Sequence, residues 1–209
     1  MIKNLLLDLG GVMVTLDRNE AVRRFESLGI HDAGRLLDPY RQNGLFLRLE
    51  MGDFTRESFT ETLNRTYDTH LPEAEVEWCL TGYFVRVDEE KFDFIRSALP
   101  REIRVFALSN TNPFAQVAME DPHFLRNGIP MRMHFEEMFL SFELRLCKPD
   151  PRIFEEVVAR TGILPSETLF LDDGAANTAE ARRQGFVTYK PRNGEDWTTV
   201  VSKMIGPEA

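Results

Sequence analysis

Five short apolar runs determine which fold class this chain can adopt. Each run has the length of a single strand, and several are apolar on both faces, as expected of parallel strands that helices cover on both sides. Helical segments with clear start and stop residues lie between the later runs; one begins at Asp150-Pro151 and ends at Gly162. This alternation predicts an α/β fold, a Rossmann-like parallel sheet with helices on both faces. The predicted strands lie within residues 2–9, 103–110, 138–144, 168–173 and 186–190.

The segment 18–85 has a different pattern from the rest of the chain. Its apolar residues recur at helical spacing, and it contains no convincing strand. We therefore predict a small α-helical cap domain at 18–85, inserted into an α/β core made of residues 1–17 and 86–209. A last helix is predicted within residues 195–205, packed back on the sheet.

Composition excludes several classes of partner. The net charge of −9 disfavours nucleic acid and anionic membranes as general partners. Cys79 and Cys147 are too few for a disulfide framework or a metal cluster. The N-terminus reads as a strand rather than a signal peptide, and no apolar run approaches membrane-spanning length. We expect a cytoplasmic protein, monomeric by default, that acts on a small molecule.

Polar side chains stand where the apolar runs end. They are Asp8, Ser109-Asn110, Lys148 and Asp172-Asp173. Ligands of an open parallel sheet bind at the carboxyl ends of its strands, so these four groups should converge on one crevice. The acids form an oxygen-rich cluster suited to a hard cation such as Mg²⁺, and Lys148 adds a fixed positive charge.

A helix N-terminus is expected at the same crevice. Asn112-Pro113 reads as an N-cap followed by the first helical position, and such a terminus directs free backbone amides toward an anion. The glycines after Asp8 let the backbone approach a ligand closely. Together these features predict a site that holds a phosphoryl group against a metal ion, with a carboxylate directed at phosphorus.

Four motifs, in order along the chain, resemble those of the haloacid dehalogenase-like (HAD-like) hydrolases. They are DLGGV at 8–12, LSNTN at 108–112, CKPDPRIF at 147–154 and FLDDGAAN at 170–177. The chain is similar to the capped group that includes the phosphatase domain of soluble epoxide hydrolase and bacterial sugar-1-phosphate phosphatases. The resemblance covers nearly the whole chain and implies a magnesium-dependent phosphatase.

The resemblance also implies a role for each motif residue. Asp8 is expected to be the nucleophile that forms an aspartyl-phosphate, while Ser109 and the Asn110 amide bind phosphoryl oxygens. Lys148 is expected to balance the charge of both the nucleophile and the phosphate. The expected ligands of Mg²⁺ are Asp8, the main-chain carbonyl of Gly10 and Asp173, with support from Asp172 and Asn177.

Gly10 departs from the family pattern. Most phosphatases of this family carry a second acid at that position, which protonates the leaving oxygen and then activates water. General acid–base catalysis contributes roughly 10²–10⁴-fold to rate, about 3–5 kcal/mol. We therefore expect weakened activity and a preference for esters whose alcohol leaves readily, such as a sugar 1-phosphate. Asp17 is an alternative proton source, although a surface position is the better interpretation.

Two other functions stay open from the sequence. A dehalogenase would share the Asp8 nucleophile but attack carbon without a metal, and the paired acids Asp172-Asp173 argue against it. A catalytically impaired protein that only binds a phosphorylated ligand is favoured by Gly10. In the cap, we expect the aromatic residues Phe46, Phe54, Phe59 and Trp78 to form the core, and the segment 50–52 could face the site.

Overall fold

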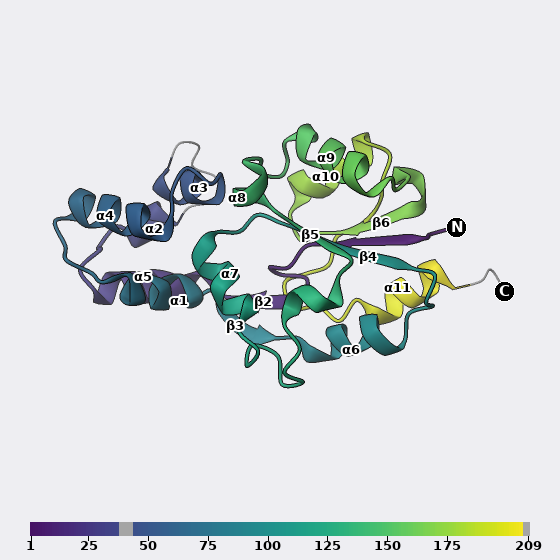
Figure 1. The fold of residues 1–209 in the computed structure, drawn as a ribbon, viewed down its shortest axis with the longest axis horizontal. Helices are drawn as coiled ribbons and strands as arrows, with labels where there is room; N and C mark the ends of the chain where they lie inside the picture. The colour runs from purple at the N-terminus through teal and green to yellow at the C-terminus, as the bar shows by residue number, and fades with distance from the viewer. Residues whose placement is uncertain (38–43, 207–209) are drawn as a thin grey trace.

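A parallel five-stranded sheet forms the centre of the computed structural model, which describes residues 1–37 and 44–206 (Figure 1). The strand order is β5-β4-β1-β6-β7, so the N-terminal strand lies in the middle. In the register, Leu7 of β1 lies opposite Ala107 of β4 on one side and Leu171 of β6 on the other. The strands span β1 Asn4–Leu7, β4 Arg104–Ser109, β5 Glu137–Leu140, β6 Thr168–Leu171 and β7 Val187–Tyr189.

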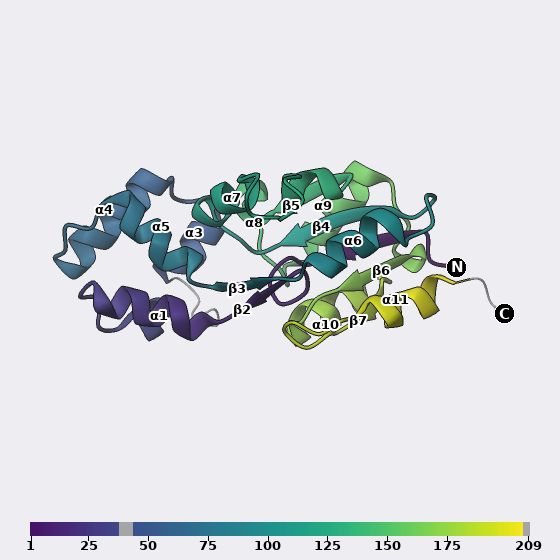
Figure 2. The same ribbon diagram turned by 90° about the horizontal axis from the view of Figure 1, so that it is seen from below.

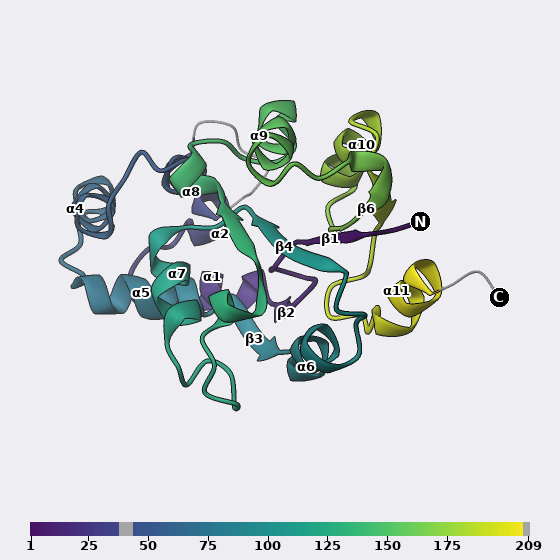
Figure 3. The same cartoon turned by 45° about the vertical axis from the view of Figure 1, so that its right-hand side comes forward.

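Both faces of the sheet are buried, which explains why its strands are apolar throughout. Leu6 points into a cluster with residues of α9 and α10, whereas its neighbours Leu5 and Leu7 point into a cluster with residues of α6, α7 and α11. Figures 1 and 3 show α9 and α10 on one side of the sheet and α6 and α11 on the other. These helices are α6 Glu89–Ser97, α7 Pro113–Glu120, α9 Pro151–Thr161, α10 Ala175–Arg183 and α11 Thr198–Ile205.

A second group of helices lies beyond one end of the sheet (Figure 1). It has its own apolar core, in which Phe25, Phe59 and Leu63 are fully buried. The expectation of Trp78 in this core is wrong, because this residue is 47% exposed and its ring lies under the Arg24 guanidinium at the surface. Phe114 of α7 reaches into this core and packs edge-on against Phe59 at 5.9 Å between ring centroids. The helices are α1 Arg18–Ser27, α2 Ala33–Leu36, α3 Leu45–Glu50, α4 Arg56–Tyr67 and α5 Glu73–Thr81.

Two short antiparallel strands connect the helical group to the sheet (Figure 2). β2 Val14–Leu16 leads into α1, and β3 Phe84–Val87 follows α5. The sequence pattern did not predict either strand, because each is short and the two pair with each other across about seventy residues. The boundary that we predicted between residues 85 and 86 falls inside β3, and the division into core and cap stays a prediction.

The predicted strands and helices are otherwise found, with one correction. The expectation of a strand over 138–144 is wrong for its second half, since Ser141–Leu144 forms the short helix α8. The Ser141 hydroxyl accepts a hydrogen bond from Thr111 N (2.9 Å) and donates one to Thr111 O (3.1 Å), which turns the chain out of the sheet. The last predicted helix is present as α11.

No helix within the described ranges combines the length and the apolar composition that crossing a bilayer requires.

Candidate active site

The polar residues at the strand ends gather at one cavity: Asp8, Ser109, Asn110 and Asp173 line it, whereas Lys148 and Asp172 lie buried behind Asp8. Asp8 follows β1, Ser109 ends β4 and Asp172 follows β6, and these strands are neighbours in the sheet. The cavity has a volume of about 420 Å³ and lies between the sheet and the helical group. Its lining includes Asp8, Gly10, Ser109, Asn110, Asn112 and Asp173 from the sheet side, and Arg18, Phe46, Glu50, Leu80 and Tyr83 from the other side.

Lys148 joins two of the acids in the buried floor of the site. Its Nζ lies 2.9 Å from Asp8 Oδ2 and 2.6 Å from Asp172 Oδ2, and it donates a third hydrogen bond to the Leu108 carbonyl at 2.7 Å. Burial lowers the pKa of Lys148, but Asp172 and Asp8 outweigh burial and raise it above its ordinary value. Lys148 is therefore a permanent cation, and all three of its protons already have acceptors.

Asn110 holds the Lys148 backbone in place. Its Nδ2 donates to the Lys148 carbonyl at 3.0 Å, and its Oδ1 accepts from the Lys148 N–H at 2.8 Å. The side-chain amide is thus committed to the protein, which leaves the backbone N–H of Asn110 as the group that can meet a phosphoryl oxygen. Within the described part of the chain, the Ser109 hydroxyl makes only a long contact of 3.4 Å with the Asn110 carbonyl, so it can reorient toward a ligand.

Asp8, Asp172 and Asp173 together suit a divalent cation. One oxygen of each lies within 4.8 Å of the others, and Lys148 is the only cation bonded to this cluster among the described residues. Burial raises the pKa of Asp8 to about 8, with Lys148 opposing and Asp172 adding to the rise. When all three carboxyl groups are ionised, one ammonium leaves two negative charges, which a bound Mg²⁺ would neutralise while lowering the pKa of Asp8 again.

The hydrogen bonds distinguish the two neighbouring acids. Asp172 is fully buried, and both its oxygens accept hydrogen bonds, from Lys148, the Gly174 N–H and Asn177 Nδ2. Asp173 is more exposed and lines the cavity. It packs so closely on Gly11, whose φ is +74°, that an added Cβ would lie 2.2 Å from Asp173 Oδ2. This arrangement suits Asp173 as the direct metal ligand and Asp172 as its support.

The helix N-terminus at the cavity differs from our expectation. Asn112 caps α7 as predicted, but its side chain accepts hydrogen bonds from both the Phe114 and Ala115 N–H groups at 3.1 Å. Pro113 has no N–H, and Gln116 donates to the Asn112 carbonyl. The expectation of free amides at this terminus is therefore wrong, because the Asn112 side chain already accepts hydrogen bonds from them.

Comparison with known proteins agrees with these motifs. A family model described as haloacid dehalogenase-like hydrolase matches residues 2–185. The chain belongs to this family. It is 39% identical to a D-ribitol-5-phosphate phosphatase of Bacteroides thetaiotaomicron over 98% of this chain and 99% of the relative.

Two solved structures resemble this HAD-like hydrolase over nearly its whole length. A predicted HAD-like family hydrolase from Porphyromonas gingivalis has a TM-score of 0.95 and 40% identity, with complete coverage of both chains. A HAD family enzyme from Bacteroides thetaiotaomicron, in complex with magnesium and inorganic phosphate, has a TM-score of 0.88 and 30% identity over 96% of this chain and 99% of that chain.

Sequence reasoning did not find several contributors to the cavity of this HAD-like hydrolase, among them Arg18, Tyr83 and Asn193. Tyr83 lines it from beyond the sheet. Asn193, after β7, also lines the cavity. It makes two hydrogen bonds with Leu16 of β2: its Oδ1 accepts from the Leu16 N–H at 3.0 Å, and its Nδ2 donates to the Leu16 carbonyl at 2.7 Å. No local signal marks these residues, because tertiary folding alone brings them to the site. The alternative proton source, Asp17, instead caps α1 by accepting from the Asn19 N–H.

Proposed function

We propose that this chain is a magnesium-dependent phosphatase that hydrolyses a small phosphomonoester through an aspartyl-phosphate on Asp8. The observation that carries the proposal is the buried chain of Asp8, Lys148 and Asp172 beside Asp173, at the floor of a cavity large enough for a sugar-sized ligand. A nucleophilic carboxylate, a fixed cation and a divalent-metal site are the groups that phosphoryl transfer requires.

In this proposal each residue has a defined task. Asp8 provides the attacking oxygen. Lys148 opposes the rise of its pKa, and a bound Mg²⁺ would lower that pKa further and so favour the ionised nucleophile. The Ser109 hydroxyl and the Asn110 N–H donate to phosphoryl oxygens.

A metal ion fits beside these groups. Asp8, the Gly10 carbonyl and Asp173 would hold it, with Asp172 and Asn177 in support; among the described residues, no backbone N–H is bonded to the Gly10 carbonyl. When bound, Mg²⁺ neutralises charge and orients the phosphoryl group.

We assign the helical segment 18–85 as the cap that covers this site and selects the substrate. Phe46, Leu80 and Tyr83 bring apolar and hydroxyl surface into the cavity opposite the acids. The relative that acts on D-ribitol 5-phosphate supports a polyol or sugar phosphate as substrate. Such a 5-phosphate is an alkyl ester, whereas the missing acid at Gly10 favours a sugar 1-phosphate.

Phosphate release tests both the function and the substrate class. The panel is D-ribitol 5-phosphate, sugar 6-phosphates, sugar 1-phosphates and p-nitrophenyl phosphate, each with Mg²⁺ and with EDTA, and Asp8→Asn is the control. We expect turnover that requires both Mg²⁺ and Asp8. The order of the esters then decides between the alkyl phosphate and the sugar 1-phosphate.

Gly10 supports a second candidate, a protein that binds a phosphorylated ligand without turnover. For that function the same panel would release no phosphate, while binding of a phosphate analogue such as vanadate would still depend on Mg²⁺. A metal-independent dehalogenase is disfavoured because Asp8, Asp172 and Asp173 bring three carboxyl groups close enough to share one cation, an arrangement that a reaction without a metal does not need.

A further inference from the structure

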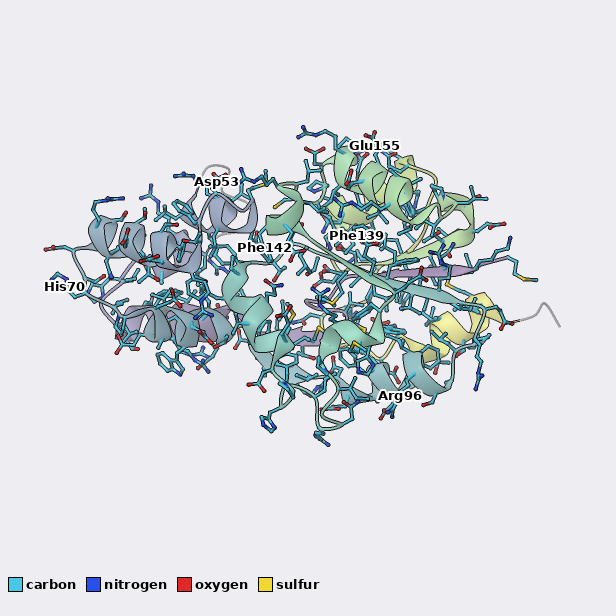
Figure 4. All side chains as sticks on the ribbon, in the orientation of Figure 1. Asp53, His70, Arg96, Phe139, Phe142 and Glu155 are labelled. Atoms are coloured by element: carbon cyan, nitrogen blue, oxygen red, sulfur yellow. The ribbon has the colours of Figure 1, made fainter. Side chains whose placement is uncertain are left out.

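The turn after α3 is docked on the sheet side of the molecule. Gly52, with φ at +73°, approaches α8 so closely that an added Cβ would lie 2.1 Å from the Phe142 carbonyl oxygen. Cys147 Sγ contacts the Glu50 carbonyl at 3.6 Å. In Figure 4, Asp53 lies beside α3 in the helical group and Phe142 lies where that group meets the sheet. These contacts fix the position of Glu50, the last residue of α3.

The Glu50 side chain faces the catalytic floor from this position. It lines the cavity that contains Asp8, and Asp8 and Lys148 both act electrostatically on its carboxyl group. The other titratable neighbours are Tyr83 and Cys147, and the charge of Glu50 contributes to the raised pKa of each. Among the described residues of the cavity lining, Glu50 is the one carboxylic acid outside the acid cluster.

The reaction needs such a group, because Gly10 cannot carry a proton. Asp17 lies on the surface as the α1 cap, beside Arg23 at 3.5 Å, and does not line the cavity. Burial raises the pKa of Tyr83, and so does the charge of Glu50, so this phenol stays protonated and cannot act as a base. Asp8 is the attacking group and Asp173 belongs to the metal site, so neither is available as the proton carrier.

Building on the proposed phosphatase function, we propose that Glu50 is the proton carrier of the reaction and replaces the acid that is absent at Gly10. Its protonation state suits this role. Burial, reinforced by Asp8 and opposed by Lys148, raises the pKa of Glu50 to about 8, so that its carboxyl group holds a proton at neutral pH.

The proton is conserved over the two steps. In the first, an Asp8 oxygen forms a bond to phosphorus, the ester P–O bond breaks, and the Glu50 carboxyl gives its proton to the leaving oxygen, which departs as the alcohol. In the second, a water oxygen attacks the phosphorus of the aspartyl-phosphate and Glu50 takes a proton from that water. The P–O bond to Asp8 breaks, its electron pair returns to the carboxylate, and inorganic phosphate leaves with Glu50 protonated again.

Glu50→Gln tests the proposal with two esters, because it keeps the side-chain shape and removes the proton. D-ribitol 5-phosphate has a poor leaving group, an alkoxide that needs a proton. In p-nitrophenyl phosphate the leaving group is p-nitrophenolate, which departs without protonation. With the alkyl ester, we expect kcat to fall by roughly 10²–10⁴-fold with little change in KM. With the aryl ester, the first turnover should keep its wild-type rate and release one molecule of p-nitrophenol per enzyme molecule as a burst. Steady-state release should then be slow, because the second step lacks its base.

The matched control is Glu57→Gln, which removes the same charge from an exposed position of α4 and should leave both kinetic constants unchanged. Unchanged kcat in Glu50→Gln, or a raised KM alone, would overturn the proposal and make Glu50 a bystander or a binding contact. If the wild-type protein releases phosphate from neither ester, the proposed function itself fails. If it turns over and Glu50→Gln matches it, only the proton-carrier role fails.

Discussion

Replacing Lys148 by methionine should cause a large loss of stability, because it removes the only cation bonded to the acid cluster within the described residues. The Lys148 ammonium is buried and has three acceptors at 2.6–2.9 Å, two of them carboxylates. Breaking a buried ion pair from one side costs about 3–5 kcal/mol, because the remaining charges are buried without compensation. For a chain of this size that lowers the unfolding temperature by about 6–20 °C.

The assay is thermal unfolding of Lys148→Met in EDTA at neutral pH, with Lys3→Met as the matched control. Lys3 makes an equally short ion pair with Glu167 (2.7 Å), but its side chain is 59% exposed, so its loss should cost about 0–1 kcal/mol. Mg²⁺ should restore part of the stability of Lys148→Met, since it also neutralises the acids. If the two variants unfold within about 2 °C of each other, charge compensation by Lys148 is not what stabilises this site.

Three further predictions follow from the site. Asp8→Asn should retain the fold and reduce Mg²⁺-dependent phosphate release to background, and residual turnover above background would exclude Asp8 as the nucleophile. Gly11→Ala should weaken Mg²⁺ binding in calorimetry, because the new Cβ would displace Asp173; Gly29→Ala is the control, with a similar positive φ but no atom within 4 Å of its Cβ. In the wild type, kcat for an alkyl phosphate should fall as pH rises above about 8, where Glu50 loses its proton, and Glu50→Gln should lack this decline.

The residues at the strand ends could be predicted from the sequence because a parallel sheet brings its carboxyl ends together. Asp8, Ser109 and Asp172 each follow or end an apolar run, so strand assignment alone placed them at one edge. The role of Asn112 as the N-cap of α7 could also be predicted. The sequence could not show that its side chain accepts hydrogen bonds from both the Phe114 and the Ala115 N–H groups.

The opposite wall of the cavity could not be predicted in the same way. Its residues belong to helices whose placement depends on the packing of Phe114 against Phe59 and on the short pairing of β2 with β3. Glu50 is one of many charged residues in a helical segment, and only its docking beside Cys147 reveals that it faces Asp8. The sequence suggested that the segment 50–52 could face the site, without giving a role to its acid.

The absence of an acid at Gly10 is compatible with an active enzyme if another group supplies the proton. An aspartate at this position requires a shift of the Leu16 side chain, because an added Cβ would lie 2.7 Å from Leu16 Cδ1; no backbone atom is among its near contacts. Gly10→Asp in the Glu50→Gln background should therefore raise alkyl-phosphate turnover above that of Glu50→Gln alone.

The most direct test of the central claim is chemical trapping of the phosphorylated residue. The protein is mixed with substrate and Mg²⁺, quenched in acid within one turnover and reduced with borohydride, which converts an acyl phosphate to an alcohol. Peptide mass spectrometry should then find homoserine at position 8, only when substrate is present. Rapid turnover with unmodified Asp8, or with the label on another residue, would contradict the account of Asp8 as the nucleophile.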